Sequence, residues 1–208
     1  FNSEIFVGLD GDTETEIHTV DLFGFRTRQG HSATLFATHN LERLDEPFEI
    51  VPGVTIPTGE YEYDEGGISF ATDNAKMVSA EGRILAGDFF DGDRIGGSTS
   101  LYLRPNRHLR SETTVEINDI DLAGGRFTAR IFRERLQVAV TPRLLSNLFV
   151  QFNDLSEVVS LNLRLNWIYR PGADLFVVFN QTWDAPSFSQ LETRNRQLIV
   201  KFTYLFQR

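Results

Sequence analysis

The stretch LNLRLNWIYRPG, residues 161–172, alternates between apolar and polar side chains. The two sets are Leu161, Leu163, Leu165, Trp167 and Tyr169 on one side and Asn162, Arg164, Asn166 and Arg170 on the other. Successive side chains of a β-strand point to opposite faces, so this period of two predicts a strand with one apolar and one polar face. The closing Arg-Pro-Gly predicts a tight turn at the end of that strand.

Segments with the same alternation recur along the chain, separated by turn residues, and no long helix is predicted. Short turns such as 27–32 and 104–107 largely alternate with longer loops such as 9–16 and 45–59. An up-and-down meander then has its short turns at one end and its long loops at the other, as in outer-membrane barrels. We predict an all-β, antiparallel up-and-down transmembrane β-barrel, either a single domain over residues 1–208 or the C-terminal portion of a larger barrel. The twelve predicted strands are 3–8, 16–27, 31–45, 59–71, 76–89, 96–104, 107–121, 125–141, 144–154, 158–170, 174–184 and 195–206.

Composition narrows the function classes. The chain has 208 residues, no cysteine and a net charge of −9, so it has neither disulfides nor thiolate metal sites, and nucleic acid is not an expected partner. No apolar run approaches the ~18 residues of a transmembrane helix, whereas barrel strands are only half apolar and fit this composition. The chain starts FNSEIFVGLD, without an initiator Met or a signal-like apolar stretch, and we expect it to be a fragment of a longer chain.

The polar face of the predicted strands favours a wet barrel interior. Opposite charges on neighbouring strands can pair across such a lumen, whereas they cannot form a dry core. A soluble sandwich also alternates, with its apolar face inward, so the alternative is a soluble or surface-exposed all-β binding module for glycans or a protein partner. The predicted lumen-facing polar residues are Arg110, Glu112, Glu116, Arg133, Arg135, Asn162, Arg164, Asn166 and Lys201.

Aromatic side chains mark the apolar face where strands are expected to end. Trp167 and Tyr169 come just before the RPG turn, and Tyr204 and Phe206 come just before the C-terminus. Tyr and Trp prefer membrane interfaces, and Trp183 is expected at the opposite rim. The last strand alternates apolar residues up to its final aromatic, which resembles the insertion signal of bacterial barrels. The predicted lipid-facing and girdle residues are Leu161, Leu163, Leu165, Trp167, Tyr169, Val200, Phe202, Tyr204 and Phe206.

The predicted strand at 125–141 changes phase along its length. Phe127 and Ile131 are apolar at odd positions, whereas Leu136 and Val138 are apolar at even positions. A β-bulge near 131–133 would produce this change. Alternatively, the first half of the strand protrudes above the membrane, where facing matters less.

Residues 126–206 resemble a known protein family. The resemblance rests on three segments, VAVTPRLLSNLFVQFND, LNLRLNWIYRPGADLFVVFNQ and LIVKFTYLF. They look like the C-terminal end of an uncharacterised bacterial outer-membrane barrel family, a domain of unknown function usually attached to a family-9-type carbohydrate-binding module. The resemblance implies the outer membrane of a Gram-negative bacterium and a barrel longer than this chain. It implies no catalytic residues.

The four histidines suggest no ready catalytic site. His39–Asn40 and His31–Ser32 supply the residue types of a Ser–His hydrolase, but adjacent residues on a strand face opposite ways. We therefore expect no enzyme and no cofactor.

Two acidic loops, LDGDTETE and GDFFDGDRIGG, supply hard oxygen ligands of the kind that calcium prefers. Asp10, Asp12, Asp91 and Asp93 are therefore weak calcium candidates. Neither loop has the full spacing of a calcium loop, so solvated acidic loops are the expected structure.

The sequence thus predicts an outer-membrane barrel that acts as a pore or as a membrane anchor for a larger envelope assembly. Its expected partners are the outer-membrane lipid bilayer and other envelope proteins.

Overall fold

The computed structural model describes residues 1–7, 13–187 and 190–205. Within these ranges the chain forms strands and turns, and no residue is helical. In the described part of the chain, no helix is long and apolar enough to cross a membrane. The strands are β1 (Asn2–Val7), β2 (Thr13–Arg26), β3 (Ser32–Leu44), β4 (Phe48–Val51), β5 (Val54–Ile56), β6 (Gly59–Ala71), β7 (Val78–Phe89), β8 (Gly92–Asn106), β9 (Leu109–Leu122), β10 (Gly125–Thr141), β11 (Leu144–Asn153), β12 (Val158–Arg170), β13 (Ala173–Ser187) and β14 (Gln190–Thr203).

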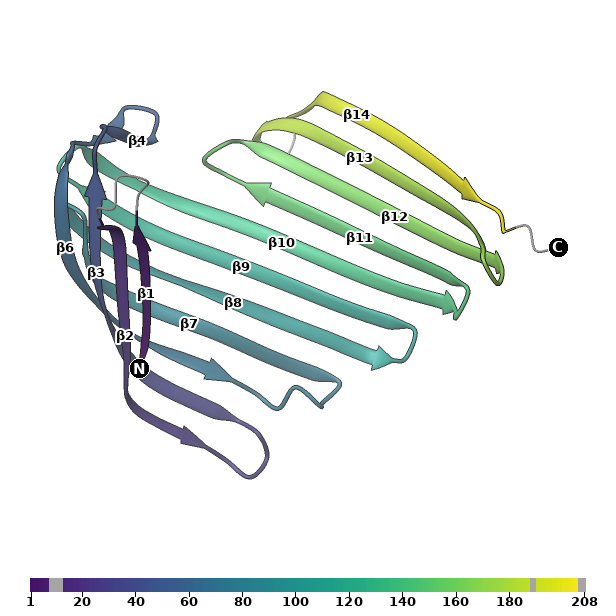
Figure 1. The fold of residues 1–208 in the computed structure, drawn as a ribbon, viewed down its shortest axis with the longest axis horizontal. Coiled ribbons are helices and arrows are strands. Elements are labelled where there is room, and N and C mark those ends of the chain that lie inside the picture. The colour runs from purple at the N-terminus through teal and green to yellow at the C-terminus, as the bar shows by residue number, and fades with distance from the viewer. Residues whose placement is uncertain (8–12, 188–189, 206–208) are drawn as a thin grey trace. The chain divides into compact units, whose positions relative to one another are not determined.

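Twelve of these strands form one sheet, in the order β1-β2-β3-β6-β7-β8-β9-β10-β11-β12-β13-β14. Neighbours in the sheet are neighbours along the chain, with β4 and β5 set aside (Figure 1). The predicted antiparallel meander of about twelve strands is confirmed for this sheet. Among the described residues β1 and β14 each pair with one neighbour, so the sheet is not closed into a barrel.

The segment predicted as a loop at 45–59 contains two further strands. Here β4 and β5 pair antiparallel as a small hairpin, with Phe48 opposite Ile56 and Glu49 opposite Thr55. Strands of four and three residues are too short to show a period of two, which explains why the sequence pattern missed them.

Contacts between residues divide the chain into two compact units. Unit 1 contains Phe1–Asp73, Glu81–Thr99 and Glu116–Ala129. Unit 2 contains Asn74–Ala80, Ser100–Val115 and Arg130–Arg208.

The hydrophobic core of unit 1 lies under the β4–β5 hairpin. Ile56 is fully buried, with an exposed fraction of 0%, and it packs against Ile120 and Leu122 of β9. Ile120 and Leu122 lie at even positions of β9, as Glu116 does, so the three side chains share one face. The hairpin therefore packs on the face that also carries this carboxylate. The partly buried residues packed around this core are Leu44, Ile50, Val54, Tyr61, Phe89, Phe90 and Phe127.

The pairing of β10 with β11 contains no bulge near 131–133, where the sequence predicted one. The pairing of β10 with β11 runs without a shift from Ile131 to Ala139, and its irregularity falls only between Ala139 and Thr141. Phe127 is apolar at an odd position because it packs against the core under the hairpin. The apolar side chain at Phe127 therefore reflects what covers this face of β10, while the pairing with β11 stays regular from Ile131 to Ala139.

Candidate functional site

The register of β10–β14 sorts the side chains of unit 2 onto two faces, because residues directly opposite in antiparallel strands share a face. One face holds the row Arg135, Phe149, Asn162, Asn180 and Gln197. We call it the polar face of unit 2, and the opposite one its apolar face.

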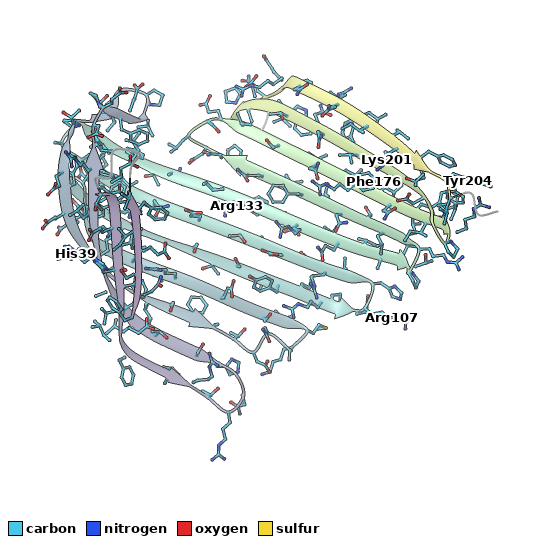
Figure 2. The ribbon with its side chains drawn as sticks, viewed as in Figure 1. His39, Arg107, Arg133, Phe176, Lys201 and Tyr204 are labelled. Carbon is cyan, nitrogen blue, oxygen red and sulfur yellow. The ribbon has the colours of Figure 1, made fainter. Side chains whose placement is uncertain are left out.

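Every described residue of unit 2 that was predicted to face a lumen lies on the polar face. Arg133 pairs with Gln151, and Arg164 pairs with Asn147. Lys201 lies opposite Phe176, in the same row as Asn166 (Figure 2). Glu112 reaches Arg135 across the strands, with 3.7 Å between carboxylate and guanidinium, and Arg110 lines a hollow with Gln137.

Amide side chains form a ladder across this face. Asn162 Nδ2 donates to Asn180 Oδ1, and Asn180 Nδ2 donates to Gln197 Oε1 over 3.3 Å. Beside the ladder, the Arg135 guanidinium lies 5.6 Å from the centre of the Phe149 ring. Polar groups that bond to one another in this way hold their positions while their outer edges remain available to a solute.

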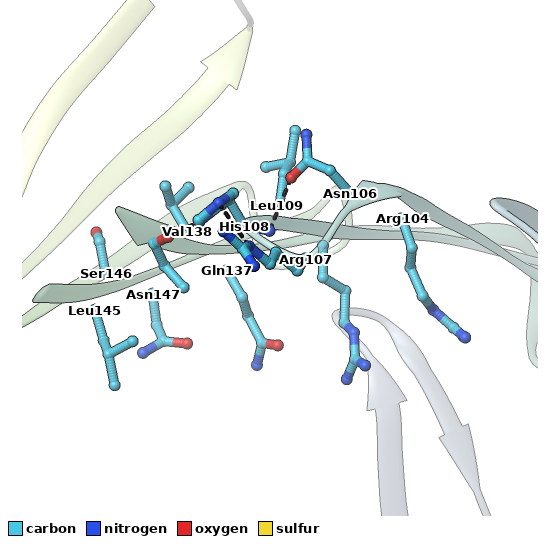
Figure 3. A pocket seen from close by; sticks show the side chains of 12 residues that line it. Arg104, Asn106, Arg107, His108, Leu109, Gln137, Val138, Leu145, Ser146 and Asn147 are labelled. Carbon is cyan, nitrogen blue, oxygen red and sulfur yellow. Dashed lines mark hydrogen bonds between the residues drawn. The ribbon is translucent and has the colours of Figure 1, made fainter. Parts of the chain in front are cut away.

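Two hollows open on unit 2 and share the side chains Gln137 and Asn147. The first, of about 580 Å³, is lined by Arg135, Gln137, Asn147, Leu148, Phe149, Asn162 and Arg164. The second, of about 440 Å³, lies at the β8–β9 turn (Figure 3). Its lining residues are Arg104, Asn106, Arg107, His108, Leu109, Arg110, Gln137, Val138, Ala139, Leu145, Ser146 and Asn147. We call the two neighbouring hollows together the basic groove, defined by Arg104, Arg107, Arg110, Arg135 and Arg164 with the amides Gln137, Asn147 and Asn162.

The apolar face of unit 2 is exposed. Leu163 is 38% exposed, Leu198 is 64% exposed and Phe202 is 64% exposed. No described layer of this unit covers them. Two rows across the strands are Leu136, Leu148, Leu163, Phe179 and Leu198, and Val138, Ser146, Leu165, Val177 and Val200.

Aromatic side chains gather on this face at the β12–β13 turn. The Tyr169 ring stacks on Phe202 at 5.6 Å between centroids, and Trp167 meets Tyr169 edge-on at 6.1 Å. The Arg170 guanidinium lies 3.9 Å from the centre of the Tyr204 ring. Trp167, Tyr169 and Tyr204 were predicted near one rim, and in the structure they lie close to the same β12–β13 turn. Phe206 lies outside the described residues.

Several polar groups within the apolar face bond to one another. Ser111 and Thr113 both donate their hydroxyls to Glu134, over 2.7 and 2.5 Å. Arg196 Nε donates to Gln181 Oε1 over 3.2 Å. Such pairing lowers the cost of polar groups on an apolar surface.

Unit 1 has its own polar hollow, lined by Arg83, Leu85, Arg94, Gly97, Ser98, Glu116 and Asn118. The predicted lumen residue Glu116 belongs to it. Arg94 Nε donates to the carboxylate of the buried Glu65 over 2.8 Å. The Arg94 guanidinium also lies 4.5 Å from the centre of the Phe89 ring.

Sequence reasoning missed a cross-strand cluster on β1, β2 and β3 of unit 1. Ser3 Oγ lies 3.0 Å from His18 Nδ1, and His18 Nε2 lies 3.2 Å from Glu16 Oε2. The His18 ring stacks on that of His39 at 6.4 Å. These are residue types of nucleophilic catalysis. An acyl-transfer site also needs donors that stabilise an oxyanion, and the Ser–His–Glu cluster itself supplies none.

The calcium candidates gain no support from the geometry. Among the described residues, no group of three or more His, Asp or Glu side chains could hold a metal ion, and this covers Asp91 and Asp93. Asp10 and Asp12 lie outside the described residues.

Comparison with known proteins yields no match to a protein-family model, to a curated protein or to a solved structure. The family resemblance of residues 126–206 stays a prediction.

Proposed function

We propose that this chain forms part or all of a transmembrane β-barrel of the bacterial outer membrane. In this proposal it acts as a pore, or as a membrane anchor for a larger envelope assembly. The observation that carries the proposal is the pair of faces in unit 2, where an exposed apolar surface lies back to back with a polar groove. A sheet in lipid needs both an apolar outside and a wet inside.

The size of the apolar surface supports the same proposal. On β12 it runs from Leu161 to Tyr169, which is nine residues. At about 3.3 Å per residue this is about 30 Å along the strand. At the tilt of about 40° usual for barrel strands, the band would be about 23 Å tall, close to the ~25 Å apolar band of outer-membrane barrels. The aromatic cluster at Trp167 and Tyr169 then lies at one interface of the band.

The soluble alternative requires the Leu161–Trp167 row to be a buried core. With Leu163 38% exposed and Trp167 48% exposed, this side of β12 lies at the surface of the present structure. Exposed apolar patches of this extent mark interaction with a membrane or a partner.

We expect the purified chain to need detergent or lipid to stay in solution. Folded in detergent, it should run at a different apparent size on a gel before and after boiling, because barrels resist unfolding by detergent alone. The measurement is gel mobility with and without heating, together with sedimentation in buffer alone. A chain that stays monomeric and folded without detergent would overturn the proposal.

We further expect Arg164→Glu combined with Lys201→Glu to shift the ion selectivity of a pore toward cations. Reversing two charges on the polar face changes the field that a passing ion meets. The measurement is the reversal potential across a planar bilayer under a salt gradient. The matched control is Arg130→Glu with Arg196→Glu, which makes the same change of charge on the apolar face. If both double variants keep the original reversal potential, the Arg164 and Lys201 side chains do not line the path of the ions.

A further inference from the structure

The basic groove of unit 2 carries an excess of cations in a chain whose net charge is −9. Among the described residues, Arg104, Arg107, Arg110 and Arg164 have no carboxylate within salt-bridge distance. Arg135 has only the long contact to Glu112, at 3.7 Å. The groove therefore concentrates positive charge that the protein itself leaves largely uncompensated.

Two arginines of the same unit that lie outside the groove behave differently. Arg130 lies 3.2 Å from Asp154, and Arg194 lies 2.5 Å from Asp184. The chain thus places acidic partners beside these two arginines and omits them in the groove. Since an arginine fork matches the geometry of carboxylate and phosphate oxygens, uncompensated forks in a hollow form a receptor for such groups.

The remaining lining of the groove also suits a solute that is long and polar. Gln137 and Asn147 line both hollows, so the two sets of arginines lie beside the same pair of amides. Asn162 adds an amide in the larger hollow, and the Phe149 ring adds an apolar surface. Amides bind hydroxyl groups, and a ring face accepts the C–H surface of a flexible chain.

We propose that the basic groove is a binding subsite for a flexible solute that carries two or more oxyanion groups. The groups can be carboxylates, as in an acidic oligosaccharide, or phosphates, as in a short polyphosphate. The proposal deepens the proposed function if the chain is a pore, since it names the class of solute, but binding itself needs only the groove and no transport.

The test is calorimetric titration of the detergent-folded chain with tripolyphosphate, with a trimer of galacturonic acid, and with an uncharged trisaccharide of the same length. We expect saturable binding of at least one anionic probe. The affinity should fall at high salt, because dissolved ions screen the attraction between the arginines and the probe. The uncharged probe should not bind measurably. The anionic probe that binds more tightly shows whether the groove prefers phosphate or carboxylate groups.

Two groove variants and one control locate the subsite. Arg107→Gln with Arg110→Gln, and separately Arg135→Gln with Arg164→Gln, should each weaken binding about tenfold, because each removes two charge-assisted contacts. Arg130→Gln with Arg196→Gln removes the same charge from the apolar face and should leave binding within about twofold, as expected for screened charges that do not touch the ligand. Circular dichroism confirms that each variant keeps its strand content.

Absence of binding by both anionic probes overturns the inference, and so does equal weakening in the groove variants and the control. Neither result bears on membrane insertion, which the detergent and heating experiments measure separately. Conversely, a soluble chain that binds the anions would support the groove while ending the membrane proposal.

Discussion

Leu163→Arg is expected to destabilise this chain strongly in lipid bilayers, whereas Asn162→Arg is expected to change its stability there only slightly. The two positions are adjacent on β12 but face opposite ways, Leu163 in an entirely apolar row and Asn162 in the amide ladder. An arginine facing lipid at the middle of a bilayer costs about 2–4 kcal/mol, while an arginine on a wet face costs little beyond the hydrogen bond lost from Asn162, about 1 kcal/mol.

The measurement for this pair is the free energy of unfolding by urea in phospholipid vesicles, with tryptophan fluorescence as the signal. The same two variants measured in detergent micelles, which adapt to a polar group more readily, should differ less. If Asn162→Arg destabilises the protein in vesicles as much as Leu163→Arg does, the proposed assignment of lipid and lumen to the two faces is wrong.

Ile56→Ala is expected to release the β4–β5 hairpin from the face of the sheet in unit 1. Ile56 is fully buried against Ile120 and Leu122. Truncating a buried isoleucine to alanine costs about 2–5 kcal/mol. An isolated two-stranded hairpin is at best marginally stable, so this loss should exceed what holds the hairpin in place.

Limited proteolysis of the 45–59 segment measures this release, and faster cleavage is the expected result. Thr55→Ala is the matched control, because Thr55 is the exposed neighbour of Ile56 on β5. Equal cleavage rates for Ile56→Ala and the unaltered chain would show that the hairpin is held by other contacts. In a pore, release of the hairpin should also raise the single-channel conductance, because the hairpin covers part of the face of unit 1 that carries the predicted lumen residue Glu116.

The pattern of alternation predicted the sheet well. All twelve strands of the sheet overlap the predicted ranges, and the meander order is the predicted one. A strand of ten or more residues shows its period of two whatever lies on either side, because the pleat alone generates it. For the same reason the partition of β12 into an apolar Leu163 side and a polar Arg164 side needed no knowledge of its neighbours.

Features that depend on a partner strand were beyond the sequence pattern. Ser3 meets His18, and Ser111 meets Glu134, only because of the register between strands. The phase change on β10 was read as a bulge because the covering of Phe127 by a hairpin distant in sequence leaves no local signal.

The sequence by itself therefore determined the strands of the sheet, their order and which side chains share a face, since these follow from the period of a single pleated strand. Only the tertiary structure decided that the β4–β5 hairpin packs on the Glu116 side of β9 in unit 1. It also decided that arginines from the β8–β9 turn and from β10 and β12 line one groove. Both depend on contacts between segments far apart in the chain, and no local periodicity records such contacts.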